Sequence, residues 1–150
     1  MDGEIMPASG TRVLRRGQRG QNIVEFALVG LVFFLIVMGI FDFGRAILYY
    51  NMLSNAAREG ARVGIIPNTP KDKICTAVIA HTQLPNAPQI PGACETGDLT
   101  VTVLPDGSTV AGQSVQVTVT YGFTPITPLI AAFTGDPLTL SASSTMYVEQ

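Results

Sequence analysis

The chain has 150 residues, of which 13% are charged, and its formal net charge is −2. This length supports one modest globular domain, and a smaller one if part of the chain lies in a membrane. The charge is divided unevenly: residues 1–20 carry four arginines and two acids, whereas residues 21–150 carry five basic and nine acidic side chains. The only basic cluster adjoins a long apolar run, so the composition does not favour nucleic-acid binding.

Residues 1–20 contain arginines, glycines and serine without apolar periodicity, and we expect them to form a cytoplasmic leader. Gly17 and Gly20 make an unaided helix start unfavourable there, because glycine is a poor helix former. Arginines that flank an apolar span on one side indicate that this side is cytoplasmic. The acidic remainder of the chain is therefore predicted to face outward.

The apolar run covers residues 23–41, and Glu25 is its only charged residue. A helix of this length spans about 28 Å, close to the roughly 30 Å of a bilayer's hydrocarbon core. The run is longer than the apolar region of an ordinary secretory signal peptide, which makes conventional cleavage behind it the weaker interpretation. No proline occurs between the apolar run and Pro67, so we predict one membrane and stalk helix over residues 21–66.

Beyond the apolar run, apolar and small residues recur in steps of three and four, which predicts one helical packing face. Small side chains on such a face allow another helix to approach closely, although the face could instead dock on the chain's own outer domain. The predicted packing face comprises Phe43, Ala46, Ile47, Tyr50, Leu53, Ala57, Gly60, Ala61 and Gly64, and the predicted polar face comprises Asp42, Arg45, Asn51, Asn55, Arg58, Glu59 and Arg62.

Residues 67–150 are predicted to form an outward-facing α/β head. Thr69 is expected to cap a helix that has Pro70 at its first position and runs to about Ala80. A proline-rich loop over residues 83–97 follows, and then three alternating stretches predict antiparallel strands near residues 99–103, 115–121 and 138–148. A short helix is expected from Thr127 to Phe133. The predicted fold class is thus α+β, with a long N-terminal helix before a small antiparallel sheet.

Cys75 and Cys94 are the only cysteines, and both lie on the predicted outward side. In an oxidising compartment such a pair favours a disulfide over two free buried thiols.

One short motif carries a function. If the chain is cut after Gly20, Glu25 becomes the fifth residue of the product and the apolar segment becomes its N-terminus. This arrangement resembles the processing site of the type IV pilin superfamily. Residues 17–28, together with the later runs 41–45 and 55–62, more narrowly resemble the TadE-like pseudopilins of tight-adherence pilus systems. The resemblance covers about residues 17–64.

The resemblance implies that a prepilin peptidase cuts between Gly20 and Gln21. The product would be a minor pilin in the cytoplasmic membrane, with possible transfer to an extracellular pilus used for adhesion. Its partners would be other pilins, the membrane assembly platform and the lipid bilayer. The Glu25 carboxylate, next to Phe26, would pair with the free amine of Gln21 on a neighbouring subunit. The alternative is that Glu25 only reaches the lipid headgroups.

No catalytic constellation, cofactor site, small-molecule substrate site or metal site is predicted. His81 and the two cysteines have no zinc-type spacing, and the cysteines are better used on each other. Two other functions remain open. One is an uncleaved, single-pass anchored protein with an outward β-rich binding domain, and the other, less favoured, is a secreted enzyme. The N-terminus of the mature protein distinguishes all three.

Overall fold

The structure is a computed structural model that describes residues 18–87, 89–127, 130–132, 135 and 137–150. The chain divides into two compact units, residues 1–36 and 37–150, and the division falls within one long helix. This helix, α1, covers Gln18–Gly64. The predicted leader apart from its last three residues lies outside the described residues.

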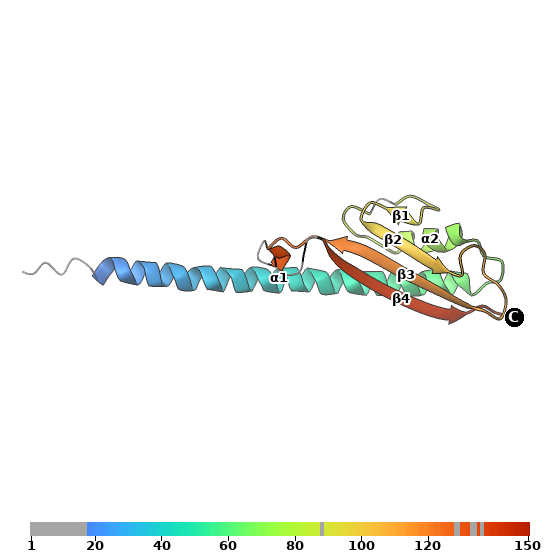
Figure 1. The fold of residues 1–150 in the computed structure, drawn as a ribbon, viewed down its shortest axis with the longest axis horizontal. Coiled ribbons are helices and arrows are strands. Elements are labelled where there is room, and N and C mark those ends of the chain that lie inside the picture. The colour runs from blue at the N-terminus through green and yellow to red at the C-terminus, as the bar shows by residue number, and fades with distance from the viewer. Residues whose placement is uncertain (1–17, 88, 128–129, 133–134, 136) are drawn as a thin grey trace, which may run out of the picture. The chain divides into compact units, whose positions relative to one another are not determined.

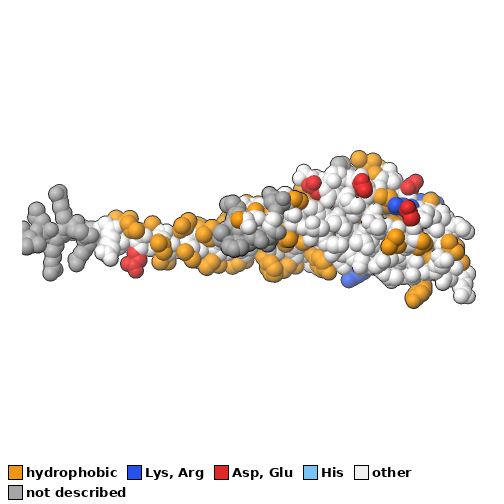
Figure 2. Space-filling model, viewed as in Figure 1, with side chains coloured by type: hydrophobic (Ala, Val, Ile, Leu, Met, Phe, Trp, Pro, Cys, Tyr) orange, Lys and Arg blue, Asp and Glu red, His pale blue; other side chains and the backbone are white. Residues whose placement is uncertain are grey.

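The first unit consists, in its described part, of the beginning of α1. From Gly20 to Ile36 every residue is exposed except Gly30, which is half-buried. α1 is long and apolar enough to cross a membrane, and its most apolar window buries nothing within the chain. Figure 2 shows hydrophobic side chains along much of the visible surface of α1.

The second unit holds the rest of α1, a second helix and a sheet (Figure 1). The elements after α1 are α2 (Lys71–Ala80), β1 (Glu95–Thr96), β2 (Leu99–Leu104), β3 (Ser114–Phe123) and β4 (Leu138–Tyr147). The four strands are antiparallel and follow the order β1-β2-β3-β4. The α+β class, with a long helix before a small antiparallel sheet, is confirmed.

The core lies between one face of the sheet and the two helices. The inward residues of β3 alternate with half-buried ones, as expected for a strand with one covered face. A Cβ built on Gly60 of α1 would contact Val78 of α2 and Val117 of β3. The absence of a side chain at Gly60 thus allows both helices to pack on the same sheet. The buried core side chains include Leu53, Ala57, Ala61, Ile74, Val101, Val103, Val115, Val117, Val119 and Phe123.

Several local predictions need correction. α1 begins at Gln18 and therefore includes Gly20, and it ends at Gly64, before the predicted Ile66. Thr69 does not cap α2: Pro70 stands at the cap position, and no side chain caps the helix. Instead, the backbone of Thr69 bonds to Thr109, with its N–H donating to the Thr109 Oγ1 at 3.1 Å. This tertiary contact takes the place of a local cap.

The loop predicted over residues 83–97 ends in a strand that sequence reading missed. β1 pairs Glu95 with Thr100 and Thr96 with Leu99, so that only two residues connect it to β2. Gly97 stands in this turn at a φ of 58°, which glycine adopts without steric cost. A two-residue strand is too short to show periodicity. Of the short helix predicted from Thr127, residues 130–132 are helical, whereas Pro128, Leu129 and Phe133 lie outside the described residues.

Candidate functional site

The residues of the predicted processing and pairing site lie on the exposed beginning of α1. Gly20, Gln21, Glu25 and Phe26 are all exposed, and 79% of the Phe26 surface is accessible. Gly20, Gln21 and Glu25 line one shallow hollow along the helix. A peptidase that cuts the Gly20–Gln21 bond would have to unwind this first turn. Glycine weakens a helix by about 1 kcal/mol relative to alanine, so Gly20 makes such opening easier.

Gly20 has no packing role among the described residues, because a Cβ placed on it would meet nothing within 4 Å. Glu25 likewise forms no ion pair or hydrogen bond with another side chain that the structure describes. Neither residue is therefore needed to hold this unit of the chain together. Both remain accessible to a partner.

The residues of the predicted packing face do not all lie on one buried surface. Ala57, Gly60 and Ala61 are buried against the sheet and α2, within the chain's own core. Phe43 lies elsewhere, with 69% of its surface exposed. Tyr50 and Ile47 are also exposed, because the stripe that contacts the head passes through other residues in this part of α1.

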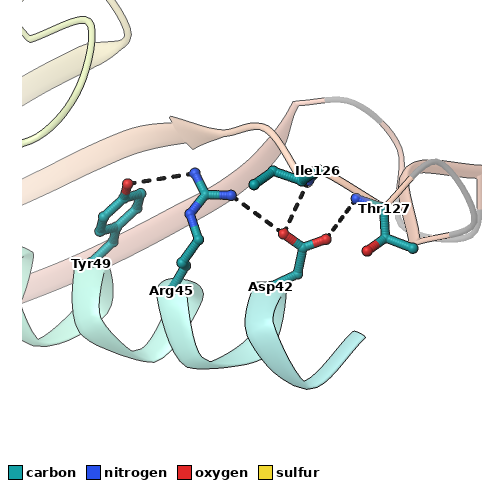
Figure 3. A network of polar contacts seen from close by, with 5 residues as sticks. All are labelled: Asp42, Arg45, Tyr49, Ile126 and Thr127. Carbon is teal, nitrogen blue, oxygen red and sulfur yellow. Dashed lines mark hydrogen bonds and ion pairs between the residues drawn. The ribbon is translucent and has the colours of Figure 1, made fainter. Parts of the chain in front are cut away.

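Asp42 belongs to that stripe, and its placement on the polar face is wrong. Only 2% of its surface is exposed. Its carboxylate accepts hydrogen bonds from the backbone N–H groups of Ile126, at 3.0 Å, and Thr127, at 2.7 Å. These two residues follow β3, so Asp42 fastens the segment after the central strand to α1 (Figure 3). We call this arrangement the Asp42 clasp.

Arg45 completes the Asp42 clasp from the same helix. Its Nη1 donates to Asp42 Oδ1 at 3.3 Å, and its Nη2 donates to the Tyr49 hydroxyl at 3.5 Å (Figure 3). The guanidinium carbon also lies 5.2 Å from the centre of the Phe123 ring, within the range of a cation–π contact. The buried Asp42 carboxylate thus has an ion-pair partner and hydrogen-bond donors, which a buried charge requires.

The pKa of Asp42, the first residue beyond the predicted span, follows from these contacts. Burial alone raises the pKa of the Asp42 carboxyl. Interactions with Thr127 and Ile126 and the positive charge of Arg45 outweigh burial, so the pKa lies below its ordinary value. Asp42 is therefore ionised at neutral pH, and the clasp is a charge-assisted one.

The disulfide prediction is confirmed. Cys75 in α2 and Cys94 before β1 are bonded, with their Cα atoms 5.1 Å apart. The carbonyl of Cys94 also accepts the N–H of Val101 at 2.7 Å, which ties the disulfide to β2. The disulfide thus holds the proline-rich connection against the sheet.

His81 stands at the C-terminal cap of α2, where its ring contacts the helix backbone. Its Nδ1 lies 2.9 Å from the carbonyl oxygen of Ala77, to which it can donate a hydrogen bond. Within the part of the chain that the structure describes, no three His, Cys, Asp or Glu side chains are grouped so that they could hold a metal ion.

The Asp42 clasp is the feature that sequence reasoning missed. The available signal was the pair of Asp42 and Arg45, three residues apart on a helix and directly after the apolar run. That spacing predicts an ion pair but does not say which side of the helix is covered. The partners from the segment after β3 are about 85 residues away in sequence, and no local pattern identifies them.

Comparison with known proteins bears on α1. Neither a curated protein nor a solved structure matches the chain. The family model described as TadE-like protein matches residues 20–62, which is α1 without its ends. The same segment contains Glu25 on its exposed part and, at the start of the second unit, the Asp42 and Arg45 side chains of the Asp42 clasp. This segment of the chain is therefore similar to the TadE-like protein family.

Proposed function

We propose that this protein is a minor pseudopilin of a tight-adherence type pilus. A prepilin peptidase removes residues 1–20, and the product is assembled through the exposed beginning of α1. The match of residues 20–62 to the TadE-like family is the observation that carries this proposal. It supports association with pilus machinery, and it gives no support for catalytic chemistry.

The physical chemistry of α1 supports the same function. Large apolar side chains from Ile23 to Ile36 are exposed, and none of the residues that the structure describes covers them. Such a helix is stable only in a bilayer or beside other apolar helices, because water disfavours so much apolar surface. Removal of the arginine-rich leader allows the helix to move from the first environment to the second.

Glu25 supports a specific role in assembly. A carboxylate within an apolar span costs a few kcal/mol unless it has a partner. Cleavage after Gly20 creates a partner in the new amino group of Gln21. We propose that Glu25 of one subunit pairs with Gln21 of the next, and that Phe26 packs beside them.

The processing step is tested by mass spectrometry of the protein purified from membranes. We expect the mature chain to begin at Gln21. The variant Gly20→Leu should retain its leader, whereas the same change at Gly30, ten residues along α1, should leave cleavage unaffected. Wild-type protein with its leader intact would instead indicate a single-pass anchored protein, and an N-terminus beyond Phe41 would indicate secretion.

The assembly step is tested by Glu25→Gln, which we expect to be cleaved and inserted normally but to be missing from isolated pili. The matched control is Glu59→Gln on the same helix, since Glu59 makes only a 3.6 Å ion pair with the exposed Arg62. Normal incorporation of Glu25→Gln would refute the pairing without affecting the processing proposal.

A further inference from the structure

Described residues between β3 and β4 lie beside α1 at the end of the apolar run. The Asp42 clasp fastens Ile126 and Thr127 to the first residue beyond that run. The Thr127 carbonyl then accepts the N–H of Ile130 at 3.1 Å and the N–H of Ala131 at 3.3 Å. Residues 130–132 are thereby held as a short helical turn next to α1, and we call them the exit turn.

The exit turn packs beside the predicted span itself. A Cβ built on Gly39 would lie 3.9 Å from Cδ1 of Ile130. Gly39 lies two residues before Phe41, the end of the span, which corresponds to about 3 Å along a helix. Ile130 also lines an apolar hollow with Phe43 and Leu138. If α1 crosses a bilayer up to Phe41, the exit turn must stand at the level of the outer lipid boundary.

The chemistry of this region fits lipid. No charged residue occurs from Phe123 to Gly135. The two charged side chains nearest by sequence to the end of the span, Asp42 and Arg45, are bonded to each other. The carboxylate is almost completely covered, so the end of the span presents no bare acid to the lipid. Around the helix at the same level, Ile40, Phe41 and Phe43 are each at least 66% exposed.

We propose that the exit turn is embedded in the outer boundary of the lipid bilayer, so that the head contacts the membrane directly beside α1. This inference rests on the proposed membrane insertion of α1. The clasp holds uncharged backbone and apolar side chains beside the end of the predicted span, where an interfacial segment would meet the lipid. The contact would fix the distance of the sheet from the membrane surface before assembly.

The chain contains no tryptophan, so a single introduced tryptophan reports on one position. We would place the full-length protein in vesicles at a low protein-to-lipid ratio and measure quenching by lipids brominated on the acyl chain. The test probe is Ala132→Trp, since Ala132 is exposed on the exit turn. Phe34→Trp, within the span, is the positive control, and Thr124→Trp, exposed on the other side of the clasp, is the matched control.

We expect Ala132→Trp to lose at least about half as much fluorescence as Phe34→Trp, as an interfacial position should, while Thr124→Trp is quenched far less. Quenching of Phe34→Trp without quenching of Ala132→Trp would overturn the lipid contact and leave the anchoring intact. The same result is expected if a second copy of the chain, and not lipid, covers the exit turn. No quenching at Phe34 would overturn the anchoring and this inference together. Non-reducing electrophoresis, which detects the Cys75–Cys94 disulfide, verifies that each variant has folded. If Ala132→Trp does not fold, a nitroxide label on Ala132→Cys repeats the measurement.

Discussion

Asp42 stands where a polar residue would ordinarily reach for water, and the fold uses it for a tertiary contact instead. Its carboxylate joins two backbone N–H groups and one guanidinium at distances of 2.7–3.3 Å. Such contacts act as a set, because removal of the carboxylate leaves the two N–H groups and the half-buried Arg45 without this acceptor. The consequences of changing Asp42 should therefore exceed those of changing an exposed acid.

We expect Asp42→Ala to lower the free energy of unfolding by about 2–4 kcal/mol, since it leaves two N–H groups and Arg45 without their acceptor. Urea unfolding of the full chain in detergent micelles measures this loss. The control is Asp106→Ala, which removes a 2.8 Å ion pair between Lys71 and an acid whose side chain is 77% exposed. That variant should unfold almost like the wild type. Equal losses in the two variants would contradict the role of the Asp42 clasp.

The lowered pKa of Asp42 predicts the direction of its pH dependence. A carboxyl whose pKa is lower in the folded state stabilises the fold above its ordinary pKa. It loses this contribution as the pH falls below about 4 towards the folded-state pKa. We therefore expect the stability difference between wild type and Asp42→Asn to be largest near neutral pH and to shrink in acid. A difference that stays constant through the acid range would show that charge does not matter here.

Two glycines of α1 should respond oppositely to the same substitution. Gly60→Ala would force a methyl group against Val78 and Val117, and overpacking of this kind costs about 1–3 kcal/mol. The methyl group added by Gly44→Ala would meet nothing within 4 Å, so this change should stabilise α1 by up to about 1 kcal/mol. Thermal unfolding of both variants tests this pair. Destabilisation of similar size at both positions would mean that α1 is not packed as described.

At the scale of elements, α1 meets three different environments along its length. Its beginning is exposed on all sides, its middle part contacts the segment after β3 on one side, and its last part is buried against α2 and the sheet. The packing stripe changes accordingly from Asp42 and Tyr49 to Leu53, Ala57 and Gly60. The helix itself is regular; its partners differ from one part to the next.

The connection between α2 and β1 depends on its covalent tie. The Cys75–Cys94 disulfide closes a separation of 19 residues that is rich in proline and turns. In the chain-entropy model, opening it should cost about 3 kcal/mol. We expect reductant to lower the unfolding midpoint of the wild type but not that of a Cys75→Ala, Cys94→Ala double variant. Identical wild-type curves with and without reductant would show that the sheet holds this connection unaided.

At the scale of the whole molecule, the two units have opposite requirements. The second unit buries its own core, whereas the described part of the first unit buries almost nothing. A domain with a core is stable in water, but a bare apolar helix needs lipid or other helices. This organisation suits the proposed transfer from a membrane to an assembly, because the head need not refold.

This organisation predicts an orientation that can be measured. A cysteine introduced at the exposed Ser143 of β4 should react with a membrane-impermeant maleimide added to intact spheroplasts. In inside-out vesicles the same cysteine should react only after detergent is added, because the four arginines of residues 1–20 predict a cytoplasmic leader and an outward head. Labelling in untreated inside-out vesicles would reverse the predicted topology.

Much of this molecule follows from local sequence. The apolar run 23–41, the alternation of Val115, Val117 and Val119, and the cysteine pair each predict their structure, because periodicity and covalent chemistry act over short distances. The same holds for the class of the fold. The TadE-like resemblance also comes from contiguous residues.

The tertiary structure alone decided which side of α1 is covered and by what. The sequence predicts Asp42 on the polar face because it is charged, yet Asp42 is buried; it predicts Ile47 on the packing face because it is apolar, yet Ile47 is exposed. The burial of Asp42 depends on a segment about 85 residues away. Hydrophobic periodicity reports the average preference of a helix face, whereas the position of a buried charge depends on partners that only the folded chain brings within hydrogen-bonding distance.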